Sequence, residues 1–540
     1  LTPMMQKYME TKEQYKDCIL FYRLGDFYEM FFDDALVASK ELEITLTGKS
    51  CGLEERAPMC GIPYHAVEGY LSKLVSRGYK VAICEQVEDP KLAKGLVKRE
   101  VIRVVTPGTN LNVQSLEAGK NNYLLSIAYT PDGIGISAAD VTTGDYYVTE
   151  VEDLKKLNDE LMKYEPSEII CNEAFLVSGF DVNDLKSRLH ISVNALESHM
   201  FDDDGCRRIL MKHFKVNTLI GLGVEEFPTG LLAAGALLQY LYDTQKTDLE
   251  HFTHIYPYLT SKYMLLDSST RRNLELTETL REKQKRGSLL WVLDKTKTAM
   301  GARLLRNYIE QPLIEKDEME KRLDAIQELN QDSISRDEIR EYLNPIYDLE
   351  RLLSKVTYKT ANPRDLIAFR NSLQMLPPIK TVLSAFEKEE LTKIREQIDG
   401  LEDIYQLIDE AIIDEPPLSI REGGMIKDQF DETIDRLRSA KHDGKQWLAQ
   451  LEEEDRERTG IKNLKIKYNK VFGYYFEVTN SYKNLVPEDY IRKQTLANAE
   501  RYTTPRLKEL EDTILNAEDK LQTLEYDVFC RIRDTIAQEL

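Results

Sequence analysis

The spacing of hydrophobic residues divides the first 110 residues into short strands and amphipathic helices. Brief apolar runs typical of buried strands lie at residues 18–23, 81–84 and 101–105. Residues 27–43 and 66–77 carry apolar side chains at helical spacing, and Gly78 follows the second segment as a helix-ending signal. This pattern predicts a small α+β domain.

The pattern changes after this segment and stays mixed to about residue 250. Strand-like runs, separated by turn sequences rich in Gly, Pro and Asp, lie at residues 123–129, 133–138 and 146–151. Helical spacing then alternates with another apolar run at residues 169–171. We therefore expect an α/β domain that begins with a meander of strands.

From about residue 260 the pattern is mainly helical, with prolines between the segments. Helices are predicted at residues 289–305, 315–330, 337–353, 363–375 and 425–458. The period then changes to two residues, with Leu464, Ile466 and Tyr468 alternating with polar residues. This predicts a half-buried strand with a basic face, a turn at Gly473 and a return strand over residues 474–478.

The last segment predicts one long helix. After Pro505, apolar residues keep a three-four spacing to Val528, consistent with a helix of about 35 residues and about 50 Å. The preceding β-rich segment would then be the tip of an arm carried on two long helices. The sequence ends inside this helix without a stop signal and begins Leu1-Thr2-Pro3 without Met. We expect this sequence to lack the first residues of the natural protein, and we expect the natural protein to continue beyond residue 540.

Charge is unevenly distributed along the chain. The formal net charge is −21 over 540 residues, which taken globally counts against nucleic acid as a partner. Residues 70–107, however, hold eight Lys and Arg against four Asp and Glu, and residues 461–508 hold ten against four. Two basic islands are compatible with DNA binding, and equally with ordinary solvated surfaces.

Several kinds of site are not supported by the residues present. The seven cysteines include no Cys-x-x-Cys pair, which favours reduced thiols in a cytosolic protein over disulfides or structural zinc. No apolar run of 18 residues exists to span a membrane. Gly48-Lys49-Ser50 resembles the end of a phosphate-binding loop, but Glu43 occupies the place of its first glycine. His251 and His254 are interpreted as two surface histidines and not as a metal site. We therefore expect no cofactor, metal or enzyme site in this chain.

The cluster Gly25-Asp26-Phe27-Tyr28-Glu29 is ambiguous when taken alone. Phe27 and Phe31 stand four residues apart, as on one face of a helix. The structural interpretation is a helix that starts at Asp26 and buries its rings. A functional interpretation needs support from the rest of the chain.

Several longer motifs supply that support, because together they resemble the bacterial MutS family of DNA mismatch recognition proteins. The first domain contributes the motifs at residues 21–29, 58–66, 81–86 and 104–109. The later segments contribute those at residues 270–275, 301–305, 473–475, 494–496 and 498–502. The motifs occur in family order along the whole chain, which makes the resemblance highly specific.

The resemblance implies a multidomain architecture. The expected order is an α+β mismatch recognition domain (1–110), an α/β connector with an RNase H-like fold (111–250), an all-α core of levers (251–425), a β-containing clamp on long helices (426–508) and a return helix of the core (509–540). The resemblance also implies a C-terminal ATPase domain, which binds ATP or ADP with Mg and makes the main dimer contacts in the family, and we expect it to lie beyond residue 540.

The resemblance also implies roles for two residues of the cluster. Phe27 would be the ring stacked into DNA beside a mispaired base, where unstacking costs less than in a correct pair. Glu29 would bond to the edge of the displaced base. A carboxylate near phosphates is favourable only when it accepts from a base N–H or becomes protonated, and a correct pair already satisfies those base edges.

Contacts to the DNA backbone are less specific. Lys49, which follows a strand of the first domain, is a candidate phosphate contact. In the clamp pattern the candidates that would hold the duplex without reading its sequence are Asn469, Lys470, Arg492 and Lys493. For each of these residues a solvated surface role is equally compatible with the sequence.

The partners implied by the resemblance are double-stranded DNA with mismatches or small loops, a second copy of the intact protein and the repair protein MutL, in a cytoplasmic, nucleoid-associated setting. A second hypothesis is a helical scaffold that uses its arm for protein partners. Salt separates the two, because DNA affinity falls steeply with added salt. An enzyme acting on its own has no supporting motif.

Overall fold

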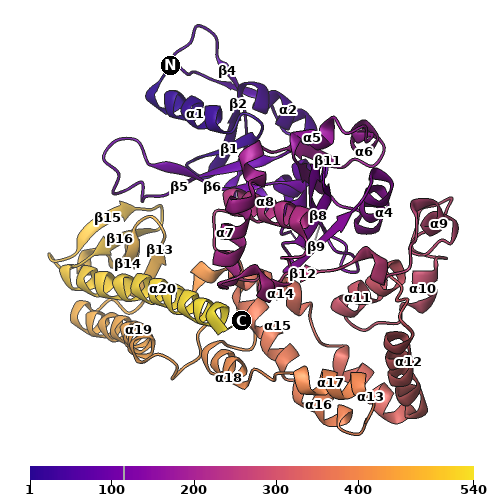
Figure 1. Ribbon diagram of the computed structural model, residues 1–540. Helices are drawn as coiled ribbons and strands as arrows, with labels where there is room; N and C mark the ends of the chain where they lie inside the picture. The colour runs from indigo at the N-terminus through magenta and orange to yellow at the C-terminus, as the bar shows by residue number, and fades with distance from the viewer. Residues whose placement is uncertain (113–115, 540) are drawn as a thin grey trace. The chain divides into compact units, whose positions relative to one another are not determined.

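The computed structural model describes residues 1–112 and 116–539 (Figure 1). The described chain divides into two compact units. The first comprises residues 1–360 and 375–399, and the second comprises residues 361–374 and 400–539. Each unit is built around its own β-sheets and helices.

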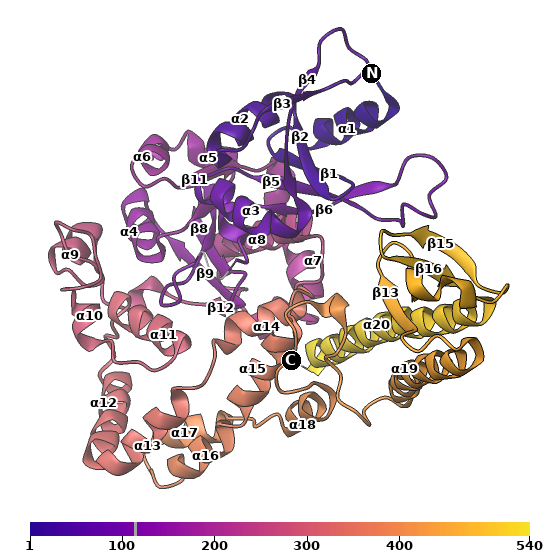
Figure 2. The same ribbon diagram turned by 180° about the vertical axis from the view of Figure 1, so that it is seen from behind.

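The first unit begins with a six-stranded sheet in the order β3-β4-β2-β1-β5-β6, in which only β1 and β5 pair in parallel. Its strands are β1 (Ile19–Leu24), β2 (Phe27–Phe31), β3 (Thr47–Lys49), β4 (Ala57–Pro63), β5 (Val81–Gln86) and β6 (Arg99–Val105). Its helices are α1 (Pro3–Gln14), α2 (Phe32–Leu42) and α3 (Val67–Ser76). Helices α2 and α3 lie on one face of this sheet and α1 lies on the other (Figure 2). Tyr28 and Met30 are in the core beneath α2 and α3, whereas Tyr8 of α1 packs on Phe31.

The helix predicted over residues 27–43 is wrong in its first part. Residues 27–31 form strand β2, and the helix begins at Phe32. Asp26 therefore lies in the turn between β1 and β2 and does not cap a helix. The error has a physical cause: residues four apart share a face in a strand as well as in a helix, and aromatic residues favour strands.

A second sheet has the order β11-β10-β7-β8-β9-β12. Its strands are β7 (Leu124–Thr130), β8 (Gly133–Asp140), β9 (Asp145–Val151), β10 (Glu168–Cys171), β11 (Ser192–Ala195) and β12 (Tyr256–Pro257). The first three form the predicted antiparallel meander, and β10 and β11 continue it in parallel. This is the mixed α/β organisation expected from the sequence, whereas its RNase H-like classification stays a prediction.

Five helices accompany this sheet: α4 (Leu154–Tyr164), α5 (Glu173–Leu176), α6 (Val182–Ser187), α7 (Asp203–Phe214) and α8 (Pro228–Gln245). Helix α8 is buried along most of its length and lies close on β8. A Cβ at Gly135 of β8 would lie 2.0 Å from the carbonyl oxygen of Thr229, so only glycine permits this approach. His251 donates through Nε2 to the Val141 carbonyl and packs on Phe252, so its interpretation as a surface histidine is wrong.

The rest of the first unit is helical. Its helices are α9 (Ser268–Asn273), α10 (Leu289–Leu293), α11 (Ala299–Glu310), α12 (Lys316–Gln331), α13 (Ser333–Leu343), α14 (Leu349–Thr357), α16 (Leu376–Leu383) and α17 (Glu389–Gln397). Two helices predicted as continuous are interrupted. Thr298 caps the start of α11 and so breaks residues 289–305, and Pro345 lies in the break of residues 337–353.

The second unit contains α15 (Pro363–Leu373), α18 (Glu402–Ala411), α19 (Glu432–Thr459) and α20 (Pro505–Glu539). Between the last two lies a sheet of order β13-β14-β16-β15, formed by β13 (Lys465–Asn469), β14 (Gly473–Thr479), β15 (Ile491–Thr495) and β16 (Ala499–Thr503). The 35-residue helix α20 confirms the length predicted for it, and it pairs with α19 beneath the sheet (Figure 1). Helix α19 begins seven residues later than predicted.

Tyr468 departs from the predicted alternation in β13. The ring was expected on the buried face, yet Tyr468 is 52% exposed and lies beside the ring of Tyr474, with centroids 5.0 Å apart. Leu464, at the other end of the alternation, is fully buried. The hydrophobic core of this sheet thus ends before the β13–β14 turn.

Candidate nucleic-acid interface

Strand geometry places Phe27 and Glu29 on one face of β2. Residues two apart in a strand project to the same side, whereas in a helix they would diverge. Tyr28, between them, points to the opposite side and is buried in the α2–α3 core. The two residues singled out in the sequence are therefore brought together, and the intervening ring anchors their strand.

Exposure increases along this face of β2. Phe31 is buried against Tyr8 of α1, with ring centroids 4.9 Å apart. Phe27, at the other end of the strand, is 47% exposed and pairs with Leu24 and Pro63 on the flanking strands. An exposed aromatic ring on a rigid, centrally paired strand can be inserted into a partner with little loss of side-chain freedom.

Gly61 leaves space beside both side chains. It is paired with Glu29 in the β2–β4 register. A Cβ at this position would lie 3.6 Å from Glu29 Cγ and 3.9 Å from Phe27 Cδ1. Gly61 lies within the family-like motif at residues 58–66, but the sequence does not indicate its role. Its place beside Glu29 depends on the register of β4 on β2, which the sequence pattern does not predict.

Tyr64 adds a second exposed ring near this end of the sheet. Its backbone N–H donates to the carbonyl oxygen of Asp26 at 2.9 Å, which fixes the end of β4 to the β1–β2 turn. The guanidinium of Arg23 lies 3.8 Å from the centroid of the Tyr64 ring. An exposed aromatic ring beside a guanidinium offers two groups on which a nucleic-acid base can stack.

Glu29 forms an ion pair with Lys49. Lys49 Nζ lies 3.1 Å from Glu29 Oε2, and the two side chains are 35% and 16% exposed. Lys49 is the last residue of β3 and does not follow a strand as expected. The pair joins two residues proposed from different motifs and partly neutralises the carboxylate.

The basic island at residues 70–107 is not one solvated face. Arg103 donates to the Thr109 carbonyl at 2.7 Å and to Gln245 Oε1 at 3.3 Å, so it is used within the structure. Lys91 and Lys94 lie exposed in the loop between β5 and β6. The exposed lysines of the island are thus divided between that loop and Lys73 of α3.

The candidates of the second basic island lie in the β13–β16 sheet. Asn469 Oδ1 accepts from the backbone N–H of Val471 at 2.8 Å and so shapes the β13–β14 turn. Lys493 Nζ donates to the Phe472 carbonyl at 2.9 Å, and Lys470 lies exposed in the same turn. Asn469, Lys470 and Lys493 therefore gather around one turn.

Arg492 lies beside the carboxylate of Glu500 and not at this turn. It lies 3.7 Å from Glu500, whose carboxylate also pairs with Lys483 at 3.1 Å. Hydrogen bonds from the Tyr502 hydroxyl and from Lys483 hold the pKa of Glu500 below its usual range. Part of the positive charge of Arg492 is therefore already compensated within the sheet.

The described part of the chain contains no cluster of metal-ligating side chains and no membrane-spanning helix. Within residues 1–112 and 116–539, no group of three His, Cys, Asp or Glu side chains could hold a metal ion. The seven cysteines are free thiols, as the sequence predicted, and burial raises the pKa of Cys84 to about 12. None of the described helices is both long and apolar enough to cross a membrane.

Comparison with protein families matches three consecutive parts of the chain. MutS domain I matches residues 2–114, MutS domain II matches residues 122–253, and MutS domain III matches residues 269–540. The last match alone covers half of the chain.

Curated relatives match over the full length of the chain. A DNA mismatch repair protein MutS of Lachnoclostridium phytofermentans is 68% identical, and proteins of the same name from Ruminiclostridium cellulolyticum and Acetivibrio thermocellus are 54% and 53% identical. The alignments include 100% of this chain but 58% of the first relative and 62% of the other two. The three domain matches, in order and with this level of identity, place the chain in the MutS family.

Proposed function

We propose that this chain recognises mismatched base pairs and small bulges in double-stranded DNA, as the first step of mismatch repair. The observation that carries the proposal is the half-exposed ring of Phe27 at the end of β2, with Glu29 on the same strand face. The name of the relatives, DNA mismatch repair protein MutS, supports the same function.

Phe27 would act as a wedge between base pairs. Insertion of a ring unstacks one step and kinks the duplex, at a cost of a few kcal/mol. A mismatched or bulged base has already lost part of its pairing and stacking, and the duplex bends more easily there. Selectivity then arises from the lower cost of deformation, without reading of particular base edges.

Glu29 would accept a hydrogen bond from the edge of the displaced base. Its pairing with Lys49 at 3.1 Å offsets the repulsion between the carboxylate and nearby phosphates. In a correct pair the base edges are already satisfied, so the carboxylate would remain unpaired. Glu29 thus penalises matched DNA, and Lys49 is available both to Glu29 and to a phosphate.

The β13–β16 sheet would hold the duplex without reading its sequence. Lys470 is the exposed cation of the β13–β14 turn and Lys493 adds charge beside it, whereas Arg492 would contribute away from the turn, next to Glu500. Asn469 keeps the turn in shape. Such contacts to phosphate supply affinity and salt dependence but no specificity.

Membership of the MutS family supports further proposals about the domains of this chain and about the intact protein. We propose a recognition domain over residues 1–110, an RNase H-like connector over 111–250, levers over 251–425, a clamp over 426–508 and a return helix over 509–540. Nucleotide-dependent signalling through an ATPase domain with ATP or ADP and Mg, pairing of two copies, contact with MutL and a cytoplasmic, nucleoid-associated location belong to the intact protein in this proposal. This chain by itself would bind DNA and catalyse no reaction.

Replacement of Phe27 by Ala tests the proposal. Titrations of the 540-residue chain with G·T, single-base-bulge and matched duplexes should show that Phe27→Ala removes the preference for the first two. Leu36→Ala, at a residue of similar exposure on α2, is the matched control and should keep the preference. A Phe27→Ala protein with the original preference would contradict the wedge.

A further inference from the structure

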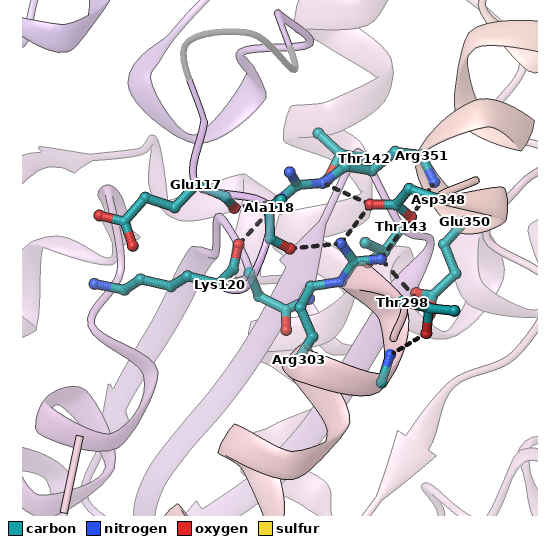
Figure 3. A network of polar contacts seen from close by, with 12 residues as sticks. Glu117, Ala118, Lys120, Thr142, Thr143, Thr298, Arg303, Asp348, Glu350 and Arg351 are labelled. Carbon is teal, nitrogen blue, oxygen red and sulfur yellow. Dashed lines mark hydrogen bonds and ion pairs between the residues drawn. The ribbon is translucent and has the colours of Figure 1, made fainter. Parts of the chain in front are cut away.

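A turn between the two sheets of the first unit presents its carbonyl oxygens to two arginines. Arg351 Nη2 donates to the carbonyl oxygens of Glu117 at 3.2 Å and Lys120 at 2.9 Å, and Arg303 Nη1 donates to that of Ala118 at 3.0 Å. The backbone N–H of Lys120 also donates to the Glu117 carbonyl at 3.3 Å. Arg351 therefore bonds to the first and the last residue of this turn. Figure 3 shows these oxygens and Asp348 directed at the guanidinium groups.

Both guanidinium groups are buried, and Asp348 at the start of α14 holds that of Arg303. Arg303 of α11 and Arg351 of α14 are 3% and 4% exposed. Asp348 accepts from both terminal nitrogens of Arg303, at 2.6 and 2.7 Å, and caps α14 by accepting from the backbone N–H of Arg351 at 3.3 Å. Two buried cations beside one another require this carboxylate together with further acceptors, which the turn supplies.

The turn is bonded to the second sheet, and the segment that follows β6 of the first sheet is bonded to that sheet as well. Before it, the backbone N–H of Gly108 donates to Glu168 Oε1 at 3.0 Å. After it, Asn121 Nδ2 and the backbone N–H of Asn122 donate to Asp140 Oδ2 at 2.9 and 3.1 Å. The arginines therefore connect α11 and α14 through the turn to the second sheet, to which the first sheet is joined by the Gly108–Glu168 and Arg103–Gln245 bonds.

We propose that Arg303 and Arg351 are positioning residues for mismatch recognition. They hold α11 and α14 against the turn at residues 117–120 and so fix the direction in which the first sheet presents Phe27. The inference rests on the proposed function and requires no contact between either arginine and DNA. Lysine cannot reproduce these contacts, because both bonds come from Nη2 at the tip of the arginine side chain, and a lysine ammonium ends one bond closer to the backbone.

Arg351→Lys tests the role while keeping the charge. We expect the ratio of mismatched to matched affinity to fall at least threefold, with matched-duplex affinity and its salt dependence unchanged. In the Phe27→Ala background, Arg351→Lys should cause no further change in this ratio, because both act through the same wedge. Arg286→Lys, at an exposed position of the same helical region, is the control and should behave as the unmodified chain.

A reversible crosslink supplies a second test. A Cβ at Gly119 would lie 3.7 Å from Cβ of Ala302 on α11, within the range of about 3.5–4.5 Å found in disulfides. Gly119→Cys and Ala302→Cys introduced together with Arg351→Lys should restore the mismatch preference when oxidised and lose it again on reduction.

The outcomes are distinct. An Arg351→Lys chain that keeps its preference while Phe27→Ala loses it overturns the positioning role alone. So does an oxidised crosslink, verified by mass spectrometry, that fails to restore the preference. An unchanged preference in Phe27→Ala overturns the proposed function and this inference with it.

Discussion

Lys49 Nζ lies 3.1 Å from Oε2 of Glu29, which joins the last residue of an outer strand to the middle of β2. The two strands are not neighbours, since β4 lies between them with Gly61 opposite Glu29. The missing side chain at Gly61 is what leaves room for the pair to extend over β4. The carboxylate of Glu29, which is proposed to bond to a base, is therefore already paired with a cation in the absence of DNA.

Removal of the Glu29 charge should reduce the preference for mismatched DNA by raising the relative affinity for matched DNA. Glu29→Gln keeps the shape of the side chain but no longer leaves an unpaired carboxylate beside matched DNA, so matched duplex should bind relatively better. Competition titrations with G·T and matched duplexes measure the ratio. Glu54→Gln, in the exposed β3–β4 loop, is the control, and an unchanged ratio in Glu29→Gln would count against the carboxylate's role.

The Lys49–Glu29 pair should contribute a small coupling energy to stability. Both side chains retain some exposure, so solvent screening limits the coupling to about 0.5–1 kcal/mol. A double-mutant cycle of Lys49→Met and Glu29→Gln, measured by thermal unfolding, isolates it. Strictly additive changes would mean that the two side chains do not interact in solution.

Gly61→Val should block recognition without unfolding the first domain. The added Cβ makes ordinary contacts with Glu29 and Phe27, and a β-branched residue suits a strand, whereas the branch would cover the space beside both side chains. Mismatch preference should be lost, with circular dichroism and melting temperature nearly unchanged. Gly61→Ala, which adds only the Cβ, should retain most of the preference; equal loss in both variants would point to a backbone effect.

Replacement of the two lysines at the β13–β14 turn should weaken binding equally for all duplexes. If Lys470 and Lys493 each neutralise one phosphate, Lys470→Ala with Lys493→Ala should lower the slope of log affinity against log salt by about 1.8. The mismatch ratio should stay constant. Lys388→Ala with Lys393→Ala, elsewhere in the helical region, is the control pair, and a changed ratio would assign the turn a role in specificity.

Buried Glu310 predicts a pH-dependent stability. Desolvation, followed by the charge of Glu165, raises its pKa from 4.5 to about 7. Because the folded value exceeds the unfolded one, the contribution to stability is fully present below pH 4.5 and is lost as pH rises through 7. Relative to Glu310→Gln, the unmodified chain should lose up to about 3 kcal/mol between pH 4.5 and 8. Thermal unfolding across this range measures the difference, and the exposed control Glu282→Gln should follow the unmodified chain.

Local periodicity predicted those elements whose pattern fits only one structure. The three strands of residues 124–151 and the 35-residue helix α20 are examples. The segment from Phe27 failed because a four-residue spacing fits both helix and strand. The Lys49–Glu29 pair could not be predicted, since it depends on the registers of β3 and β2 on β4, which no local pattern determines. The same holds for Arg351, whose partners lie more than 230 residues earlier in the sequence.

The short strand β12 affects how the chain can be divided. It pairs with β9 at Tyr147 and Val148, and the Tyr258 carbonyl accepts from Thr149 Oγ1 at 2.7 Å, so residues far along the chain cover the open edge of the second sheet. A shortened protein that stops before Tyr256 would leave backbone N–H and C=O groups of β9 unpaired, and an uncovered edge strand readily pairs with another molecule. Aggregation of such truncated proteins would therefore begin at β9.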